Sequence, residues 1–297
     1  MELDKSSLAE AKGDRDNARE RNEMNARLRA ASCAALSLGA TLVRASTNDL
    51  FTVKGYGSFD LSSGYVLYGA RMNDEPCYWT YGELSLGSSP WGEIGASLWQ
   101  NTDMTTRRKE SLRRMNEWDW AVFWRNSLDL AEDIRLNVEV GHVWYKYHGV
   151  RPVARETYHT MEEWKSRLSL ENPVLSPYFE AYYDHAVCKG AFMLGGVRHV
   201  FSLPYDLSLT LDCSCGGGSR NYNACMYPPF DGSVHGGLAY AQFAGVLSYW
   251  FNEHVGVHLM LAFDSLIDPD IRDAVSSDGG TYANDFVWGT VGLDVAF

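Results

Sequence analysis

Apolar residues recur at every second position over most of the chain beyond residue 56, in segments of about ten residues separated by turn-rich breaks. In one such segment, Trp120, Val122 and Trp124 share one parity, while Asp119 and Arg125 share the other. A period of two is that of a β-strand. The sequence predicts about twelve strands, near residues 56–68, 78–87, 91–101, 117–128, 133–147, 157–170, 175–187, 190–203, 206–215, 236–251, 254–266 and 285–297.

The breaks between these segments differ in length. Short breaks such as 88–90 and 252–253 contrast with longer ones at 102–116, 216–235 and 267–284. The second face of the segments is largely Gly, Ala, Ser, Thr and Asn, as if it faced a confined polar lumen, and many of the 10 Trp and 17 Tyr lie near segment ends. The pattern predicts an all-β protein, an antiparallel transmembrane β-barrel of about twelve strands.

Residues 1–45 differ in kind from the rest. Arg27 and Arg29 precede a run of small and apolar residues from Ala30 to Val43, and Val43-Arg44-Ala45 has the small residues that a signal-peptide cleavage site needs. We therefore expect a helical N-terminal extension with a signal peptide over 1–45, cleaved near Ala45, and a barrel over 46–297. The alternative is a soluble amphipathic helix followed by a buried one.

Composition excludes two other classes of protein. The chain has no run of about 18 apolar residues, so it is not a helical transporter. Its formal net charge is -12, from 38 acidic and 26 basic residues, so nucleic acid is not an expected partner. The basic run Arg107-Arg108-Lys109 predicts either contact with lipopolysaccharide phosphates or a solvated loop.

The last eight residues, Thr290 to Phe297, resemble the terminal β-signal of bacterial outer-membrane barrels. That resemblance implies that Gly292, Val295 and Phe297 are recognised by the barrel-insertion machinery and that Phe297 closes the last strand against the first. A final strand of an ordinary core is the alternative.

A second resemblance extends loosely along the barrel region. Residues 59–69, 73–76, 177–184 and 285–297 are similar to a group of porin-like outer-membrane proteins of about twelve strands. The group implies a bacterial outer-membrane location, contact with outer-membrane lipid and a transport or surface role, and it supplies no substrate. Leu67-Tyr68 departs from it, because a basic residue is expected before Gly69.

The cysteines are odd in number outside the predicted signal peptide, so at least one is free or paired between chains. They are Cys77, Cys188, Cys213, Cys215 and Cys225. A disulfide from Cys225 to Cys213 or Cys215 is feasible, and free thiols are the alternative. Zinc is disfavoured because no histidine stands near Cys213 and Cys215. We expect no metal site and no cofactor.

Histidines offer little further chemistry. His254 and His258 have a helical ligand spacing, but on a strand they lie about 13 Å apart, so we interpret them as lumenal or interfacial polar residues. A barrel enzyme acting on lipid would need Ser and His on the outer wall, and His159, His199 and Ser248 are the candidates. No spacing singles them out, and we predict no catalytic residue.

Strand parity points a set of charged side chains inward. They are Asp60, Glu83, Asp119, Arg125, Arg135, Glu139, Glu180, Asp184, Asp264 and Asp294. Acids outnumber the two arginines, so the sequence predicts a porin-like channel for small solutes with a weak preference for cations. The alternatives are a structural barrel in which Arg125 and Arg135 pair with neighbouring acids, and a soluble secreted β-protein that binds a ligand.

Overall fold

The structure is a computed structural model that describes residues 52–73, 75–88, 91–104, 116–148, 160–227, 234–277 and 284–297. The predicted signal peptide at 1–45, the basic run at 107–109 and His159 lie outside the described residues. No described helix has the length and apolar character needed to cross a membrane.

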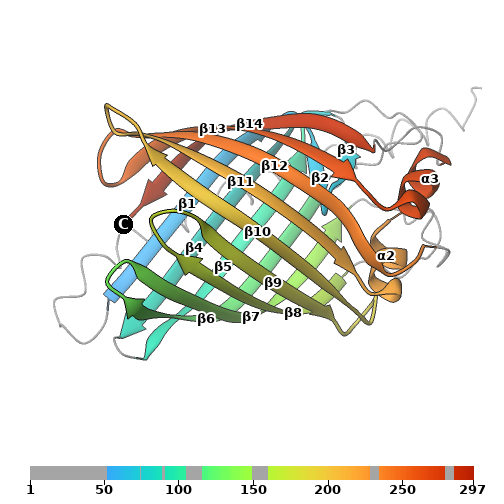
Figure 1. The fold of residues 1–297 in the computed structure, drawn as a ribbon, viewed down its shortest axis with the longest axis horizontal. Coiled ribbons are helices and arrows are strands. Elements are labelled where there is room, and N and C mark those ends of the chain that lie inside the picture. The colour runs from blue at the N-terminus through green and yellow to red at the C-terminus, as the bar shows by residue number, and fades with distance from the viewer. Residues whose placement is uncertain are drawn as a thin grey trace, which may run out of the picture. The chain divides into compact units, whose positions relative to one another are not determined.

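Twelve strands of the described residues close into an antiparallel barrel, in which β14 pairs with β1 and β1 pairs with β4 (Figure 1). The barrel strands are β1 (Thr52–Ser62), β4 (Cys77–Ser88), β5 (Gly92–Asp103), β6 (Asn116–Ala131), β7 (Ile134–His148), β8 (Thr160–Glu171), β9 (Ser176–Asp184), β10 (Gly190–Ser202), β11 (Leu207–Gly218), β12 (Gly237–Trp250), β13 (Val255–Leu266) and β14 (Asp285–Ala296). The predicted closed antiparallel β-barrel is confirmed.

Alternation along each strand sends apolar side chains outward. On β13, Leu259, Leu261 and Phe263 are 49%, 59% and 44% exposed, whereas Ala262 and Asp264, which have the other parity, are 2% and 0% exposed. In water, an apolar wall repeated around the barrel would be costly, but lipid requires such a wall around a polar interior. The alternation is therefore that of a membrane-spanning β-barrel, with an apolar wall toward lipid and a polar interior.

The two ends of the barrel differ in their connections. One end, called here the turn end, carries connections of a few residues, such as 132–133 and 203–206, and β14 finishes there. The other, called the loop end, carries the longer connections, with α2 (Arg220–Met226) and α3 (Pro269–Ser277) (Figure 1). Short turns on one side and long loops on the other are the arrangement of membrane barrels.

The first predicted strand, 56–68, is divided in the structure. Strand β1 ends at Ser62, and the chain then forms a separate hairpin of β2 (Tyr65–Leu67) and β3 (Ala70–Asn73). Its tip, Tyr68-Gly69, has φ angles of 47° and 75°. Positive φ at both central residues is the geometry of a tight hairpin turn, and Gly69 adopts it without a steric penalty. Sequence alternation continues through the hairpin, although its strands have left the barrel wall.

The hairpin and both helices pack into one apolar cluster at the loop end. Ser219 caps α2 by accepting from the Tyr222 N–H, and Asp268 accepts from the first amides of α3. Ile271 and Val275 of α3 are fully buried. The buried members of this loop-end cluster are Ala70, Met161, Cys188, Phe192, Tyr222, Met226, Tyr227, Val234, Ala239, Tyr240, Leu266, Ile271 and Val275.

Candidate functional site

The interior of the barrel carries charged side chains held in ion pairs, here called the interior ion pairs. On β4, β5 and β6, Arg125 lies 2.7 Å from both Glu83 and Glu93, and Lys54 of β1 also pairs with Glu93. A cavity of about 530 Å³ lies beside this group, lined by Lys54, Tyr56, Glu83 and Arg125 among others. The two arms of the guanidinium bridge carboxylates from neighbouring strands, which a lysine could not do in the same way.

Further ion pairs continue around the wall from β7 to β11. They join Lys165 to Glu139 at 3.1 Å, Arg167 to Glu180 at 3.3 Å and Arg198 to Asp212 at 2.9 Å. In each pair the two residues belong to adjacent strands and to the inward parity, so cross-strand pairing brings opposite charges together. The interior is thus polar and strongly charged, with both signs present.

A histidine with two carboxylate partners lies where the barrel closes. His258 of β13 places Nε2 2.6 Å from Asp60 of β1 and Nδ1 2.7 Å from Asp294 of β14. Ionised carboxylates only accept hydrogen bonds, so both ring nitrogens donate and the ring is an imidazolium. A side chain at Gly292 would collide with the Asp60 carboxylate and with the His258 ring. Glycine at this position therefore lets the side chains of His258 on β13 and Asp60 on β1 meet across β14.

Acidic side chains at the loop end have neutral partners instead. Glu163, fully buried, accepts from the hydroxyls of Tyr145 at 2.7 Å and Tyr222 at 2.8 Å. Asp264 accepts from Gln242 and Trp288. Burial and the neighbouring Glu163 raise the pKa of the Tyr222 phenol well above its usual value, so this hydroxyl remains a donor.

The β2–β3 hairpin crosses the interior at this end. Tyr65 donates to Glu117 of β6. The Tyr68 ring lies 4.3 Å from the Phe192 ring of β10 and 5.9 Å from the Tyr222 ring of α2. Since β6 and β10 are separated by three strands in the barrel, the hairpin spans the space between distant parts of the wall.

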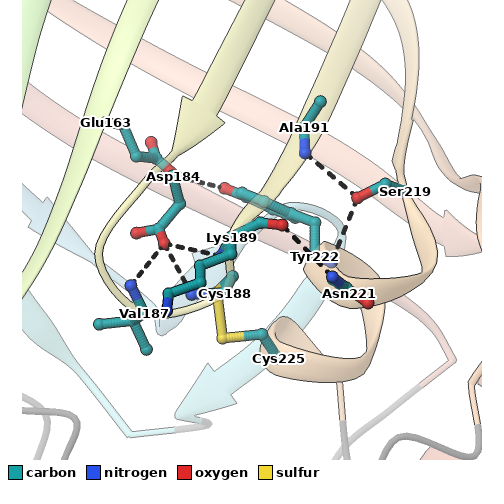
Figure 2. Close-up of a disulfide and its surroundings, with 10 residues drawn as sticks. All are labelled: Glu163, Asp184, Val187, Cys188, Lys189, Ala191, Ser219, Asn221, Tyr222 and Cys225. Carbon is teal, nitrogen blue, oxygen red and sulfur yellow. Dashed lines mark hydrogen bonds between the residues drawn. A yellow bond between two sulfur atoms is a disulfide. The ribbon is translucent and has the colours of Figure 1, made fainter.

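A disulfide ties the loop end together. Cys188, in the connection between β9 and β10, is bonded to Cys225 of α2 (Figure 2). A disulfide from Cys225 to Cys213 or Cys215, which the sequence made feasible, is therefore wrong, and those two cysteines are free thiols. Both of those residues are exposed on the outward face of β11, whereas Cys225 packs against the loop-end cluster. Cys77 is free and buried.

Asp184 organises the connection that holds Cys188. Its Oδ1 accepts from the backbone N–H groups of Val187, Cys188 and Lys189, at 2.7, 2.6 and 3.1 Å (Figure 2). One carboxylate thus satisfies three consecutive amides of a tight connection, as Asp does in Asx-type turns. Asp184 therefore has a structural role in positioning the disulfide.

Removal of the disulfide is expected to destabilise the loop end without opening the barrel. The bond closes a loop with a sequence separation of 37 residues, and loops of this size contribute about 2–4 kcal/mol. The double variant Cys188→Ser/Cys225→Ser should lose that much unfolding free energy, measured by urea titration followed by tryptophan fluorescence, while its heat-modifiable migration on a gel persists. The exposed Cys213→Ser is the matched control and should leave the midpoint unchanged; an unchanged midpoint in the double variant would contradict the assignment.

The structure sorts the ten side chains predicted to point inward into three groups. Asp60, Glu83, Arg125, Glu139, Glu180 and Asp294 take part in the ion pairs, and Asp119, Asp184 and Asp264 lie toward the loop end. Arg135 lies near the turn end, paired with Asp129, and both side chains are more than half exposed. Arg125 and Arg135 thus pair with acids, as the alternative of a structural barrel required.

Sequence reasoning missed the partners of these residues. The missed interior side chains are Lys54, Glu93, Glu117, Glu163, Lys165, Arg167, Arg198 and Asp212. The signal was present, because Lys165 and Arg167 share the inward parity of Glu163 within β8. Their segment carries polar residues on both faces, which obscured that parity.

The remaining sequence candidates are not assembled into a site. Ser248 of β12 is paired with His258 and faces the interior, whereas His199 of β10 has the outward parity, so the two cannot act together on lipid. Phe297 exchanges two backbone hydrogen bonds with Gly55, at 2.8 and 3.0 Å. A side chain at Gly55 would collide with the Phe297 ring. The final residue therefore packs against the first strand.

No protein-family model matches the sequence, and no curated protein matches it. Several solved barrels have a similar fold. The KdgM porin is 10% identical, with a TM-score of 0.43, over 83% of this chain and 99% of that one. An outer membrane channel from Pseudomonas putida F1 is 9% identical, with a TM-score of 0.48, over 84% and 96%. Outer membrane phospholipase A from Escherichia coli is 15% identical, with a TM-score of 0.44, over 82% and 92%. At these identities the likeness concerns the barrel fold alone.

Proposed function

We propose that this chain is a porin-like channel that lets small polar solutes cross the outer membrane. The observation that carries the proposal is the lining of the barrel, where the ion pairs beside the 530 Å³ cavity present charge to the interior. A barrel filled for stability alone has no need of so many interior charges, because apolar side chains fill such a space at lower cost.

With twelve strands, the side chains and segments inside the barrel decide whether it conducts. Eight strands enclose a space that side chains can fill, whereas sixteen or more leave an aqueous channel. Twelve strands lie between these limits, so conduction depends on what occupies the interior. In the proposed channel, the β2–β3 hairpin and the loop-end cluster form the constriction, and the ion pairs line the wider part toward the turn end.

The channel is proposed to prefer cations weakly. Among the described inward side chains, the acids near the constriction, Glu117, Glu163 and Asp264, accept from Tyr or Gln donors, whereas the acids of the ion pairs are matched by Arg, Lys or His258. An excess of one sign along a pore attracts ions of the other. The paired arginines keep this preference small.

Planar-bilayer recording tests both conduction and preference. The purified chain is expected to open ion-conducting channels, with a reversal potential under a KCl gradient of the sign for cations. Glu83→Gln removes one acid beside the cavity and should move the reversal potential toward anion selectivity, whereas Arg125→Gln should move it in the opposite direction.

This experiment has a matched control variant and two outcomes that would contradict the proposal. Asp129→Asn makes a similar change at the exposed turn end, away from the cavity, and should leave the reversal potential as in the parent. Absence of conductance from correctly folded barrels would favour a structural barrel instead. Equal reversal potentials in Glu83→Gln and Arg125→Gln would remove the ion pairs from the conduction path.

Assembly is proposed to depend on the terminal strand. Gly292, Val295 and Phe297 would be read by the barrel-insertion machinery, and the packing of Phe297 against Gly55 supports a role in closing the barrel. Outer-membrane lipid contacts the apolar wall, and lipopolysaccharide is the proposed partner of the loop end.

A further inference from the structure

Three potential metal ligands meet on the outer wall of the barrel, away from the proposed pore. They are His142 of β7, Glu162 of β8 and His185, which directly follows β9. The Nε2 atoms of His142 and His185 lie 3.0 Å apart, and the His185 Nε2 lies 3.8 Å from the Glu162 Oε2. All the candidate ligand atoms lie within 4.8 Å of one another, although the residues are up to 43 positions apart in the sequence.

These distances suit a single ion. Two nitrogens bound to one tetrahedral zinc at about 2.0–2.1 Å lie about 3.3 Å apart. The observed nitrogen to nitrogen and nitrogen to oxygen distances, 3.0 and 3.8 Å, lie on either side of that value. Imidazole and carboxylate are ligands that zinc and other late divalent transition metals accept.

The site is outward facing and close to the loop end. His142 has the parity of Val140 and Trp144, which are 46% and 38% exposed, and it pairs with Trp164 of β8. The rings of Trp144 and Trp164 lie 4.3 and 4.7 Å from the His142 ring. Tryptophans concentrate at membrane borders, so these ligands are at the edge of the lipid, where aqueous ions have access.

Burial of His142 is poorly compensated without an ion. The residue is only 8% exposed, and its Nδ1 has no hydrogen-bond partner among the described residues. Its other nitrogen meets only a second imidazole. A buried polar ring that makes one hydrogen bond to a like group is costly, and a shared cation would use both Nε2 lone pairs at once.

The backbone around the site is already ordered. The His185 N–H donates to the Glu162 carbonyl at 3.2 Å, and the next residues are fixed by the Asp184 carboxylate. Glu162 and His185 are 39% and 36% exposed, which leaves a face for water as a further ligand. Little reorganisation separates the observed arrangement from a coordinated one.

We propose that His142, Glu162 and His185 form a binding site for a divalent transition metal ion such as Zn²⁺. The ion would clamp the β9–β10 connection to β7 and β8 on the outer wall. This site is independent of conduction, because its ligands point away from the barrel interior.

The test is a zinc titration of the full-length barrel in detergent micelles, in competition with a chromophoric chelator. Cys213 and Cys215 are free and exposed, and thiolates are zinc ligands, so every protein carries Cys213→Ser and Cys215→Ser to exclude competition from them. The parent should bind one zinc ion tightly, and His185→Gln and Glu162→Gln should each weaken that binding by at least about tenfold. Cobalt substitution should give the visible absorption of a tetrahedral nitrogen and oxygen site in the parent only.

The matched control is His199→Gln, which removes an outward histidine far from the cluster and should bind zinc as the parent does. Heat-modifiable migration establishes that each variant is folded, and Glu162→Gln serves if His185→Gln does not fold. The proposal is overturned if the folded parent binds no zinc, or if both ligand variants bind it as tightly as the parent.

Discussion

Replacing residues 65–73 with a short Gly/Ser linker is expected to raise the single-channel conductance severalfold. The hairpin formed by these residues lies across the interior, where the Tyr65 hydroxyl donates a hydrogen bond to Glu117 and the Tyr68 ring packs on Phe192. Its removal leaves an aqueous path where aromatic rings now stand, and a twelve-stranded wall is wide enough for that path to conduct. Planar-bilayer recordings of parent and variant at equal salt measure the change.

Point variants separate the constriction from a general loosening of the barrel. Tyr68→Ala removes one ring from the loop-end cluster and should give an intermediate increase. Tyr205→Ala, at the turn end where Tyr205 is 86% exposed, is the matched control and should conduct as the parent does. If the hairpin variant folds and conducts like the parent, the hairpin is not the constriction.

His258→Gln is expected to lower the unfolding free energy by about 3 kcal/mol. The imidazolium is the shared partner of Asp60 and Asp294, whose side chains are 11% and 8% exposed, and its loss leaves two carboxylates facing each other. Breaking a buried ion pair by removing one partner typically costs about 3–5 kcal/mol, and some access to interior water places this site at the lower end. Urea unfolding of the refolded barrel measures the difference.

A second substitution distinguishes charge repulsion from lost packing. Asp60→Asn in the His258→Gln background removes one of the two facing charges and should recover part of the lost stability, a coupling that a double-mutant cycle reports. The outward His199→Gln should change little. A His258→Gln barrel as stable as the parent, with no recovery from Asp60→Asn, would show that these contacts do not hold the strands together.

The barrel itself could be predicted from the sequence because successive residues of a strand face opposite sides, so the lipid-facing and interior-facing residues alternate along the chain. The outward parity of Trp120, Val122 and Trp124 needs no tertiary information. The division at Ser62 could not be predicted in this way. Tyr65 and Leu67 continue the alternation, but they use it to pack inside the barrel rather than against lipid.

Pairings across the molecule were the harder part. Strand parity predicts which acidic side chains point into the barrel. Their partners, however, depend on which strands are adjacent and on the register of the pairing. Cys188 and Cys225 meet because the barrel brings the β9–β10 connection beside α2, and His142 and His185 meet across β8. Local spacing in the sequence does not identify such neighbours, so the sequence left the pairing of Cys225 open between free thiols and the nearby Cys213 or Cys215.

Closure of the barrel also affects how fast the protein folds and unfolds. Most strand pairs join consecutive segments, but β1 meets β14 across nearly the whole chain, and Tyr56 bonds Asp294 at a separation of 238 residues. Joining such distant segments is slow because loop entropy opposes it, so this pairing should form late. Interactions that form after the transition state govern the rate of unfolding rather than that of folding. The His258 contacts across β13, β14 and β1 therefore act as a latch on the assembled barrel, extending its lifetime more than they hasten its formation.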